Sequence, residues 1–289
     1  AKGVGLFRTE FFYMNASGAP DEEEQFRTYS EVSNRVKPNS VIIRTLDIGG
    51  DKLLENSVEA ELNPFLGWRG IRVSLCRPEM FKTQLRAVLR AASSARIGIM
   101  FPMISTLDEL KRAKELLNEA ENELMHEGVV YERPAEIGAM IEVPSAALIA
   151  DQLAKEVDFF SVGTNDLVQY TMAVDRINER VSDLYQPLNP AVVRLLKETV
   201  NAGHAAGIWV GVCGEMASDL YFTPLLIGLG FDELSVGAPR VPAIKYAIRS
   251  LDYNVCQSMA ADALSDISPD EILSRCKKIA FDSYPELIG

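Results

Sequence analysis

The sequence lacks any apolar run near the roughly 18 residues that a membrane-spanning helix needs, and it has no basic leader followed by an apolar stretch. It also lacks a surplus of positive charge, because 41 acidic residues outnumber 29 basic ones and leave a net charge of −12. Nucleic acid binds to a basic stripe, so we expect neither a membrane nor a nucleic-acid partner. An anionic substrate would then need arginines concentrated in one place.

Cysteines are few and scattered, at positions 76, 213, 256 and 276, without CxxC or metal-binding spacing. This pattern predicts reduced thiols in a cytoplasmic protein rather than a disulfide framework. No GxGxxG motif follows an apolar run, which argues against an open dinucleotide-binding sheet. The 289 residues, 47% of them hydrophobic, are enough for a single domain over 1–289 with a sizeable core. The start at Ala1, without Met, suggests a piece of a longer protein.

Apolar runs alternate with amphipathic stretches along the whole chain, an order that predicts parallel βαβ units. The runs expected to be strands are 3–10, 41–47, 96–104, 136–142, 159–162, 208–213 and 231–236. The main helices are expected at 21–36, 79–92, 106–128, 145–157, 165–176 and 191–206. Uniformly apolar strands favour an α/β fold of the TIM (β/α)8 type. Seven runs rather than eight would leave that barrel without its first βα unit.

Charged or reactive side chains stand where these strands end, and folding alone does not require that pattern. They are Arg8, Arg44, Glu142, Asn165, Asp166 and Cys213. In a TIM barrel the active site lies at the carboxyl ends of the strands. For Asn165 and Asp166 the alternative is a helix N-cap, which is the usual role of such a pair after a strand. Gly49, Gly50, Asp51 and Lys52 form a loop whose glycines would let the backbone approach a ligand.

Arginines on neighbouring strands predict an anion site. Arg8 and Arg44 each offer two parallel donors, a geometry that suits phosphate or carboxylate oxygens, and Arg69 and Arg176 are further candidates. Glu142 and Asp166 are expected on adjacent strands and are suitable ligands for Mg²⁺. The alternative is that these carboxylates pair with the arginines instead. A metal, carboxylates and arginines together are the usual apparatus of phosphoryl transfer.

Cys213 allows two interpretations. A Cys at the end of such an apolar strand is most often a small buried hydrophobic residue. Among arginines, its thiol could instead be a proton donor or a nucleophile. The two histidines, His126 and His204, fall in helical stretches away from the strand ends and are predicted to be exposed or structural.

Six stretches together carry a resemblance to a known family. They are GVGLFRTEFFYM, RTLDIGGDK, NPFLGWRGIR, MIEVPSA, FFSVGTNDLVQYTMAVDR and GVCGEMA, in this order. Over nearly the whole chain the sequence resembles the C-terminal domain of the enzyme I family of the bacterial phosphoenolpyruvate:sugar phosphotransferase system. Pyruvate phosphate dikinase, phosphoenolpyruvate synthase and a nitrogen-related paralogue of enzyme I share the blocks and stay open as alternatives, as does a phosphoenolpyruvate-binding regulatory module without turnover.

The resemblance implies roles for the candidate residues. Arg8 and Arg44 would clamp the phosphoryl group of phosphoenolpyruvate, Arg69, Asn165 and Arg176 would also hold substrate, Glu142 and Asp166 would bind Mg²⁺, and Cys213 would protonate the methylene carbon of enolpyruvate. It implies a TIM barrel that forms homodimers and passes the phosphoryl group to a His on a separate N-terminal domain. That His would in turn supply a His-containing phosphocarrier protein for sugar uptake. Neither the phospho-His motif nor the first barrel strand of the family occurs in these residues.

Overall fold

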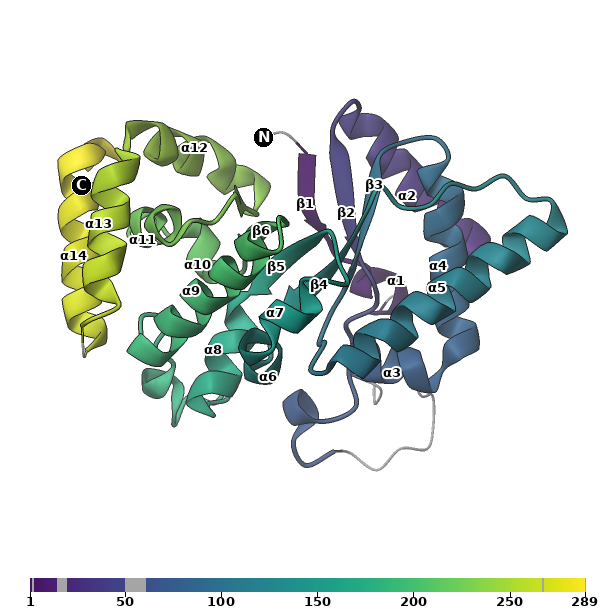
Figure 1. The fold of residues 1–289 in the computed structure, drawn as a ribbon, viewed down its shortest axis with the longest axis horizontal. Coiled ribbons are helices and arrows are strands. Elements are labelled where there is room, and N and C mark those ends of the chain that lie inside the picture. Colours follow the sequence, from purple (N-terminus) through teal and green to yellow (C-terminus); the bar gives the residue numbers. More distant parts are fainter. Residues whose placement is uncertain (2, 15–19, 50–60, 267, 289) are drawn as a thin grey trace. The chain divides into compact units, whose positions relative to one another are not determined.

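Strands and helices alternate along the chain in a computed structural model that describes residues 1, 3–14, 20–49, 61–266 and 268–288 (Figure 1). The strand order follows the sequence from β1 to β7. All strand pairs with a resolved register are parallel. This is the α/β fold of the TIM-barrel type that the sequence predicts, with seven strands in the described residues.

Contacts between residues divide the chain into two compact units. The N-terminal unit comprises Lys2–Met140 and Glu156–Asp158, and the C-terminal unit comprises Ile141–Lys155 and Phe159–Gly289 together with Ala1. The expectation of one domain over 1–289 stays a prediction.

The strands of the N-terminal unit are β1 (Gly3–Phe7), β2 (Ser40–Arg44), β3 (Ile97–Phe101) and β4 (Glu136–Ile141), whose last residue belongs to the C-terminal unit. In their register Val41 lies opposite Ile97, and Ile99 lies opposite Ile137. Every residue of β3 is buried, which explains its unbroken apolar sequence, because a central parallel strand is covered on both faces.

The helices predicted at 21–36, 79–92 and 106–128 are found within one residue of those bounds, and the other helices of this unit were not predicted. The helices of this unit are α1 (Glu10–Met14), α2 (Glu22–Val36), η2 (Pro64–Leu66), α3 (Ile71–Cys76), α4 (Pro78–Ala92) and α5 (Leu107–Glu127). The Asp21 side chain accepts the Glu24 N–H at the start of α2. Thr106 and Glu109 form a reciprocal capping box that begins α5, and Gly128 ends it in the left-handed conformation. Helix α4 packs against both α2 and α5.

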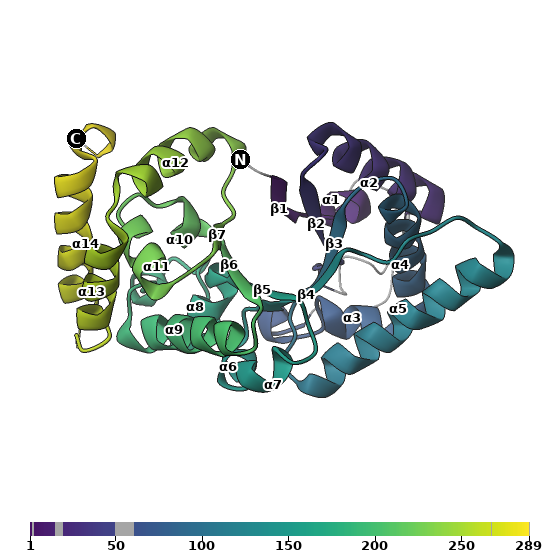
Figure 2. The same cartoon turned by 45° about the horizontal axis from the view of Figure 1, so that its top comes forward.

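The C-terminal unit has three paired strands, β5 (Phe159–Gly163), β6 (Trp209–Cys213) and β7 (Glu233–Leu234). Its helical elements are α6 (Pro144–Leu148), α7 (Ala150–Leu153), α8 (Thr164–Met172), η3 (Ser182–Leu184), α9 (Pro190–Ala205), α10 (Glu215–Ser218), α11 (Thr223–Leu229), η4 (Ala238–Arg240), α12 (Val241–Ser250), α13 (Tyr253–Ala263), α14 (Pro269–Ser283) and η5 (Pro285–Leu287). Helices α13 and α14 pack side by side, as Figure 2 shows.

The elements predicted over 145–157 and 231–236 differ from the structure. The helix expected over 145–157 is two short helices, because the backbone of Ile149 (φ −107°, ψ 20°) leaves the helical conformation between them. The strand expected over 231–236 shrinks to Glu233 and Leu234. The first residue of that range, Phe231, donates its N–H to the Leu226 carbonyl at the end of α11. This N–H therefore cannot also bond to the neighbouring strand β6.

The structure bears on the state of the cysteines and on the character of the helices. All four cysteines are free thiols; Cys76 is exposed, and the other three are buried. Among the described helices, none combines the length and the apolar character needed to cross a bilayer.

Candidate functional site

The predicted site residues do stand at the carboxyl ends of their strands. Arg8 follows β1, Arg44 is the last residue of β2, Glu142 follows β4, Asn165 and Asp166 follow β5, and Cys213 ends β6. The N-terminal unit holds the arginines 8, 44 and 69, and the C-terminal unit holds Glu142, Asn165, Asp166, Arg176 and Cys213.

Arg44 is buried and forms two ion pairs within its unit. Its guanidinium contacts the Glu10 carboxylate, and its Nη1 lies 3.0 Å from Oδ2 of Asp47. The same nitrogen is 3.7 Å from the sulfur of Met140. Arg44 therefore pairs with carboxylates, and Glu10 and Asp47 are two of them.

Asp47 joins two of the predicted arginines. Nη2 of Arg69 is 3.0 Å from each oxygen of this carboxylate, and Nη1 of Arg44 is 3.0 Å from Oδ2. Burial by itself would raise the pKa of Asp47, but the charges of Arg44 and Arg69 outweigh it and hold that pKa below its usual value. Sequence reasoning missed Asp47 and Glu10. Their positions in the sequence could have indicated them, because Glu10 follows Arg8 by two residues and Asp47 follows Arg44 by three.

Arg8 differs from Arg44 because it is exposed. The next residue, Thr9, is buried and donates its hydroxyl to the Arg44 carbonyl at 3.1 Å. Gln84 of α4 donates to the Thr9 hydroxyl and accepts the Leu46 N–H at 3.0 Å. These bonds fix the ends of β1 and β2 to each other, so that Arg8 and Arg44 leave neighbouring strands as predicted. Of the Gly49–Lys52 loop only Gly49 lies within the described residues.

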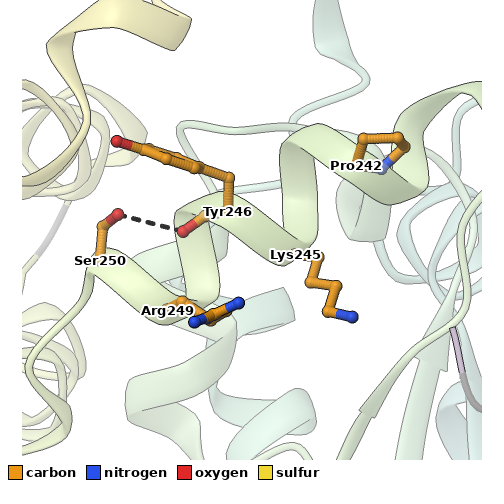
Figure 3. A pocket seen from close by; sticks show the side chains of 5 residues that line it. All are labelled: Pro242, Lys245, Tyr246, Arg249 and Ser250. Atoms are coloured by element: carbon orange, nitrogen blue, oxygen red, sulfur yellow. Dashed lines mark hydrogen bonds between the residues drawn. The ribbon is translucent and has the colours of Figure 1, made fainter.

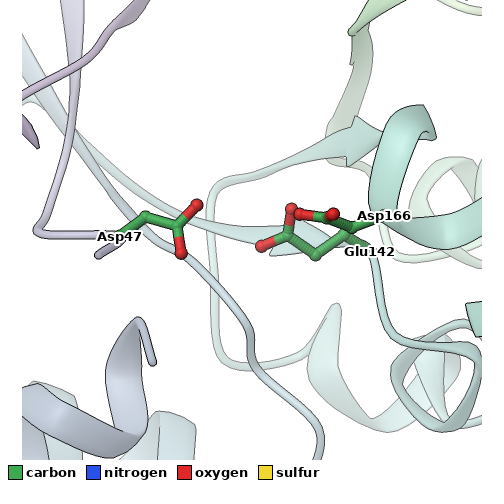
Figure 4. A group of neighbouring side chains, drawn as sticks. All are labelled: Asp47, Glu142 and Asp166. Carbon is green, nitrogen blue, oxygen red and sulfur yellow. The ribbon is translucent and has the colours of Figure 1, made fainter. Parts of the chain in front are cut away.

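In the C-terminal unit, Glu142 and Asp166 offer carboxylate oxygens within 4.8 Å of each other (Figure 4). Their residues are only 2% and 7% exposed. Two negative charges this close in a poorly solvated place repel, and a bound cation relieves that repulsion. A pair of hard carboxylate oxygens that leaves other coordination positions to water and ligand is a donor set that fits Mg²⁺.

Asn165 does not cap helix α8. The helix begins one residue earlier, at Thr164, and its N-cap, Gly163, makes no side-chain capping bond. The Asn165 side chain instead accepts the Glu215 N–H through Oδ1 at 2.9 Å. The capping alternative is therefore wrong, and the side chain connects the turn after β5 with the turn after β6.

A second bond ties these turns together. The buried Thr164 hydroxyl donates to the Cys213 carbonyl at 2.8 Å. Gly214, at φ +94°, is required at this close approach, because a Cβ there would lie 2.4 Å from Oγ1 of Thr164. Cys213, only 4% exposed, donates its thiol to the Val162 carbonyl at 3.5 Å. A carbonyl oxygen only accepts hydrogen bonds, so this neighbour suits a thiol rather than a thiolate.

Arg176 does not lie on the helix that was predicted to carry it. Helix α8 ends at Met172, and Ala173 turns the chain in the left-handed conformation (φ 54°). The N–H of Arg176 then donates to Oε1 of Gln169 at 3.2 Å, which folds the following segment back onto α8. Ala rarely adopts this conformation, so the sequence carried no signal for the turn.

The histidines are placed as predicted, on helices. His126 of α5 bonds through Nδ1 to the Asn122 carbonyl at 2.8 Å. His204 of α9 bonds through Nε2 to Asp232 at 2.8 Å. Both have local structural partners.

A cavity of about 570 Å³ lies along α12, and its lining includes none of the predicted site residues. It is lined by one face of that helix, namely Pro242, Lys245, Tyr246, Arg249 and Ser250 (Figure 3). The Ser250 hydroxyl there donates to the Tyr246 carbonyl at 3.1 Å.

The chain belongs to the family of PEP-utilising enzymes, because residues 1–253 match the model of their PEP-binding domain. Among its relatives are proteins named phosphoenolpyruvate-protein phosphotransferase. That of Staphylococcus carnosus (strain TM300) is 50% identical over 274 residues, covering 94% of this chain and 48% of that protein. That of Bacillus subtilis (strain 168) is 49% identical over 278 residues, covering 96% and 49% respectively. The chain thus spans about half the length of these curated relatives.

Among solved structures, a magnesium/glyoxylate complex of Haloferax volcanii malate synthase matches with a TM-score of 0.52. The match covers 78% of this chain and 60% of that one, at 16% identity. At that identity the match concerns the fold alone.

Proposed function

We propose that this chain is the phosphoenolpyruvate-binding domain of a phosphoenolpyruvate-protein phosphotransferase, which moves the phosphoryl group of phosphoenolpyruvate to a histidine on another domain. The observation that carries the proposal is the match to a PEP-binding domain over residues 1–253, within which anion-binding, metal-binding and acid side chains all follow parallel strands. The names of the relatives favour this function over a dikinase, a synthase, a nitrogen-related paralogue or a regulatory module.

The arginines bind the phosphoryl group and the carboxylate of the substrate. Arg8 is exposed and available to an anion, whereas Asp47 fixes the guanidinium planes of Arg44 and Arg69. Guanidinium groups held in advance lose less conformational entropy when they bind oxygen atoms, so positioning favours binding. Asn165 and Arg176 are proposed to hold substrate as well.

Glu142 and Asp166 hold Mg²⁺ when it is bound. The ion supplies charge that stabilises the oxygens of the phosphoryl group during transfer. Glu142 directly follows β4 and Asp166 lies in the first turn of α8, and both are buried, so their positions are fixed before the ion arrives.

Cys213 completes the reaction as a general acid. Transfer of phosphorus breaks its bond to the enol oxygen and leaves the enolate of pyruvate. The methylene carbon then takes the thiol proton of Cys213, which yields pyruvate and a thiolate that later regains a proton from solvent. The Val162 carbonyl, 3.5 Å from the Cys213 sulfur, is a partner for a thiol proton and supports this role.

The acceptor histidine is proposed to lie on a separate N-terminal domain of the intact protein, because His126 and His204 lie on helices and each is bonded to a neighbouring group. From there the phosphoryl group would pass to a His-containing phosphocarrier protein for sugar uptake. A cytoplasmic homodimer is the assembly that the resemblance implies.

Calorimetry tests the proposal. Phosphoenolpyruvate should bind the chain in the presence of Mg²⁺, and Mg²⁺ should bind weakly alone but tightly with the substrate, because two carboxylates leave most of its shell to other oxygens. Asp166→Asn, which removes one ligand charge and keeps the shape, should abolish that coupling. Asp151→Asn, at an exposed position of α7, is the matched control.

Equal Mg²⁺ affinity with and without phosphoenolpyruvate, or the same affinity in Asp166→Asn, would overturn the metal assignment. A second assay follows pyruvate release. The chain alone should bind phosphoenolpyruvate without consuming it. Pyruvate formed without the phospho-His domain would contradict the proposal that the acceptor histidine lies on another domain.

A further inference from the structure

The side-chain amide of Asn165 uses its oxygen, Oδ1, in a hydrogen bond within the protein, and its nitrogen, Nδ2, can donate to a ligand. Its Oδ1 accepts the backbone N–H of Glu215, and a backbone N–H can only be a donor, so the amide orientation is fixed. The two N–H donors on Nδ2 therefore face the other way. This is the orientation that an anionic ligand requires, and it depends on how firmly the Asn165 backbone is held.

Tyr185 makes the contact that holds this backbone. Its hydroxyl lies 3.3 Å from the Asn165 carbonyl, across 20 residues of sequence. Tyr185 itself directly follows η3, and its N–H donates to the Ser182 carbonyl at 2.9 Å. Burial raises the pKa of Tyr185 to about 12, so the hydroxyl keeps its proton and remains a donor at neutral pH.

The segment between α8 and Tyr185 is attached at both ends. Its beginning is held by the bond from the Arg176 N–H to the Gln169 side chain, and its end by the bond from Tyr185 to Asn165. Through its contact with the Asn165 carbonyl, the Tyr185 hydroxyl lies next to one of the proposed ligand-binding residues. No motif of the sequence singles out this tyrosine.

We propose that Tyr185 is a positioning residue for phosphoenolpyruvate binding: its hydroxyl fixes the Asn165 backbone so that the Asn165 amide presents its N–H donors to the ligand. The inference rests on the proposed function for the identity of the ligand. The fixing of the turn does not depend on it.

The test uses the full 289-residue chain with Tyr185→Phe, which removes only the hydroxyl, and with Tyr253→Phe on the exposed face of α13 as control. Loss of one neutral hydrogen bond should weaken phosphoenolpyruvate binding in saturating Mg²⁺ by roughly 3- to 10-fold. In an Asn165→Ala background the same substitution should change affinity by less than about 2-fold, since Tyr185 acts through Asn165. Tyr253→Phe should leave affinity unchanged.

Hydrogen exchange of the ligand-free chain separates the two claims. Tyr185→Phe should speed exchange of the amides at 164–167, while the control should not. Unchanged exchange there, or an equal loss of affinity with and without the Asn165 side chain, would overturn the role of Tyr185. If the wild-type chain binds no phosphoenolpyruvate but Tyr185→Phe still speeds exchange at 164–167, the proposed function fails. The conclusion that Tyr185 fixes the Asn165 backbone then remains.

Discussion

The hydroxyl of Thr164 offers the sharpest test of how the two strand-end turns are held together. Thr164→Val replaces the hydroxyl by a methyl group of nearly the same shape, so it opens no cavity. It removes the donor to the Cys213 carbonyl, now bonded at 2.8 Å in a fully buried place. The added methyl also enters the tight space beside Gly214.

The expected cost follows from the burial of this bond. A buried hydrogen bond contributes about 0.5–1.5 kcal/mol net, and removing one partner costs up to about 3 kcal/mol where the other stays buried. Thr164→Val should therefore lower the free energy of unfolding by about 1–2 kcal/mol. Thr164→Ser keeps the donor and should cost no more than about 1 kcal/mol for the lost methyl group.

Thr199→Val is the matched control. Thr199 is equally buried, and its hydroxyl also donates at 2.8 Å, to the Leu195 carbonyl. That carbonyl lies four residues earlier in α9 and keeps its helical hydrogen bond after the substitution. The control should therefore cost less than about 0.5 kcal/mol.

Urea unfolding measured by tryptophan fluorescence gives the readout. The chain has two tryptophans, so the Trp68→Phe background leaves Trp209 of β6, stacked on Phe159, to report on the C-terminal unit alone. The midpoint for Thr164→Val should fall by roughly 0.5–1 M urea. A midpoint no lower than that of the Thr199→Val control would refute the claim that this bond joins the two turns.

Three further outcomes are expected. Gly228→Ala should destabilise the chain by about 1–3 kcal/mol in urea unfolding, because its Cβ would lie 2.0 Å from the Cys256 carbonyl between α11 and α13. Cys213→Ser in the intact parent should leave phosphoenolpyruvate affinity nearly unchanged and slow pyruvate formation by about 10² or more, since it removes a positioned acid. The free energy of unfolding should fall between pH 9 and 10, because burial raises the pKa of Cys256 to about 11 and of Cys276 to about 12 while both thiols ionise near about 8.5 in the unfolded chain.

Each of these has its own control. Gly207→Ala, with no neighbour within 4 Å, should cost only the backbone strain of its positive φ. Loss of affinity with unchanged turnover in Cys213→Ser would make Cys213 a packing residue. For the alkaline effect, the unfolded chain binds fewer protons than the folded one, so each thiol removes about 1.4 kcal/mol per pH unit. The double variant Cys256→Ala/Cys276→Ala should show a flatter slope, and an unchanged slope would exclude these thiols.

The strands and capped helices were predictable because their signals are local. The unbroken apolar run of β3 reflects burial on both faces, and Thr106 with Glu109 specifies the start of α5 by itself. The strand-end positions of the candidate residues followed from the same runs.

The rest depended on tertiary contacts. Asn165 follows a strand, where an Asn usually caps a helix. Its side-chain oxygen instead accepts the backbone N–H of Glu215, which is distant in sequence. Arg176 leaves the helix at an alanine in a conformation that favours glycine, and the ion pairs of Arg44 involve acids that the sequence did not single out. Such partners are set by the approach of two strand ends, which periodicity does not encode.

The most direct test of the account is a crystal structure of this chain soaked with Mg²⁺ and phosphoenolpyruvate. We predict the phosphoryl group on Arg8 and Arg44, the ion on Glu142 and Asp166, and the methylene carbon facing the thiol of Cys213. Phosphoenolpyruvate bound without these arginines, or Mg²⁺ held by other side chains, would contradict it.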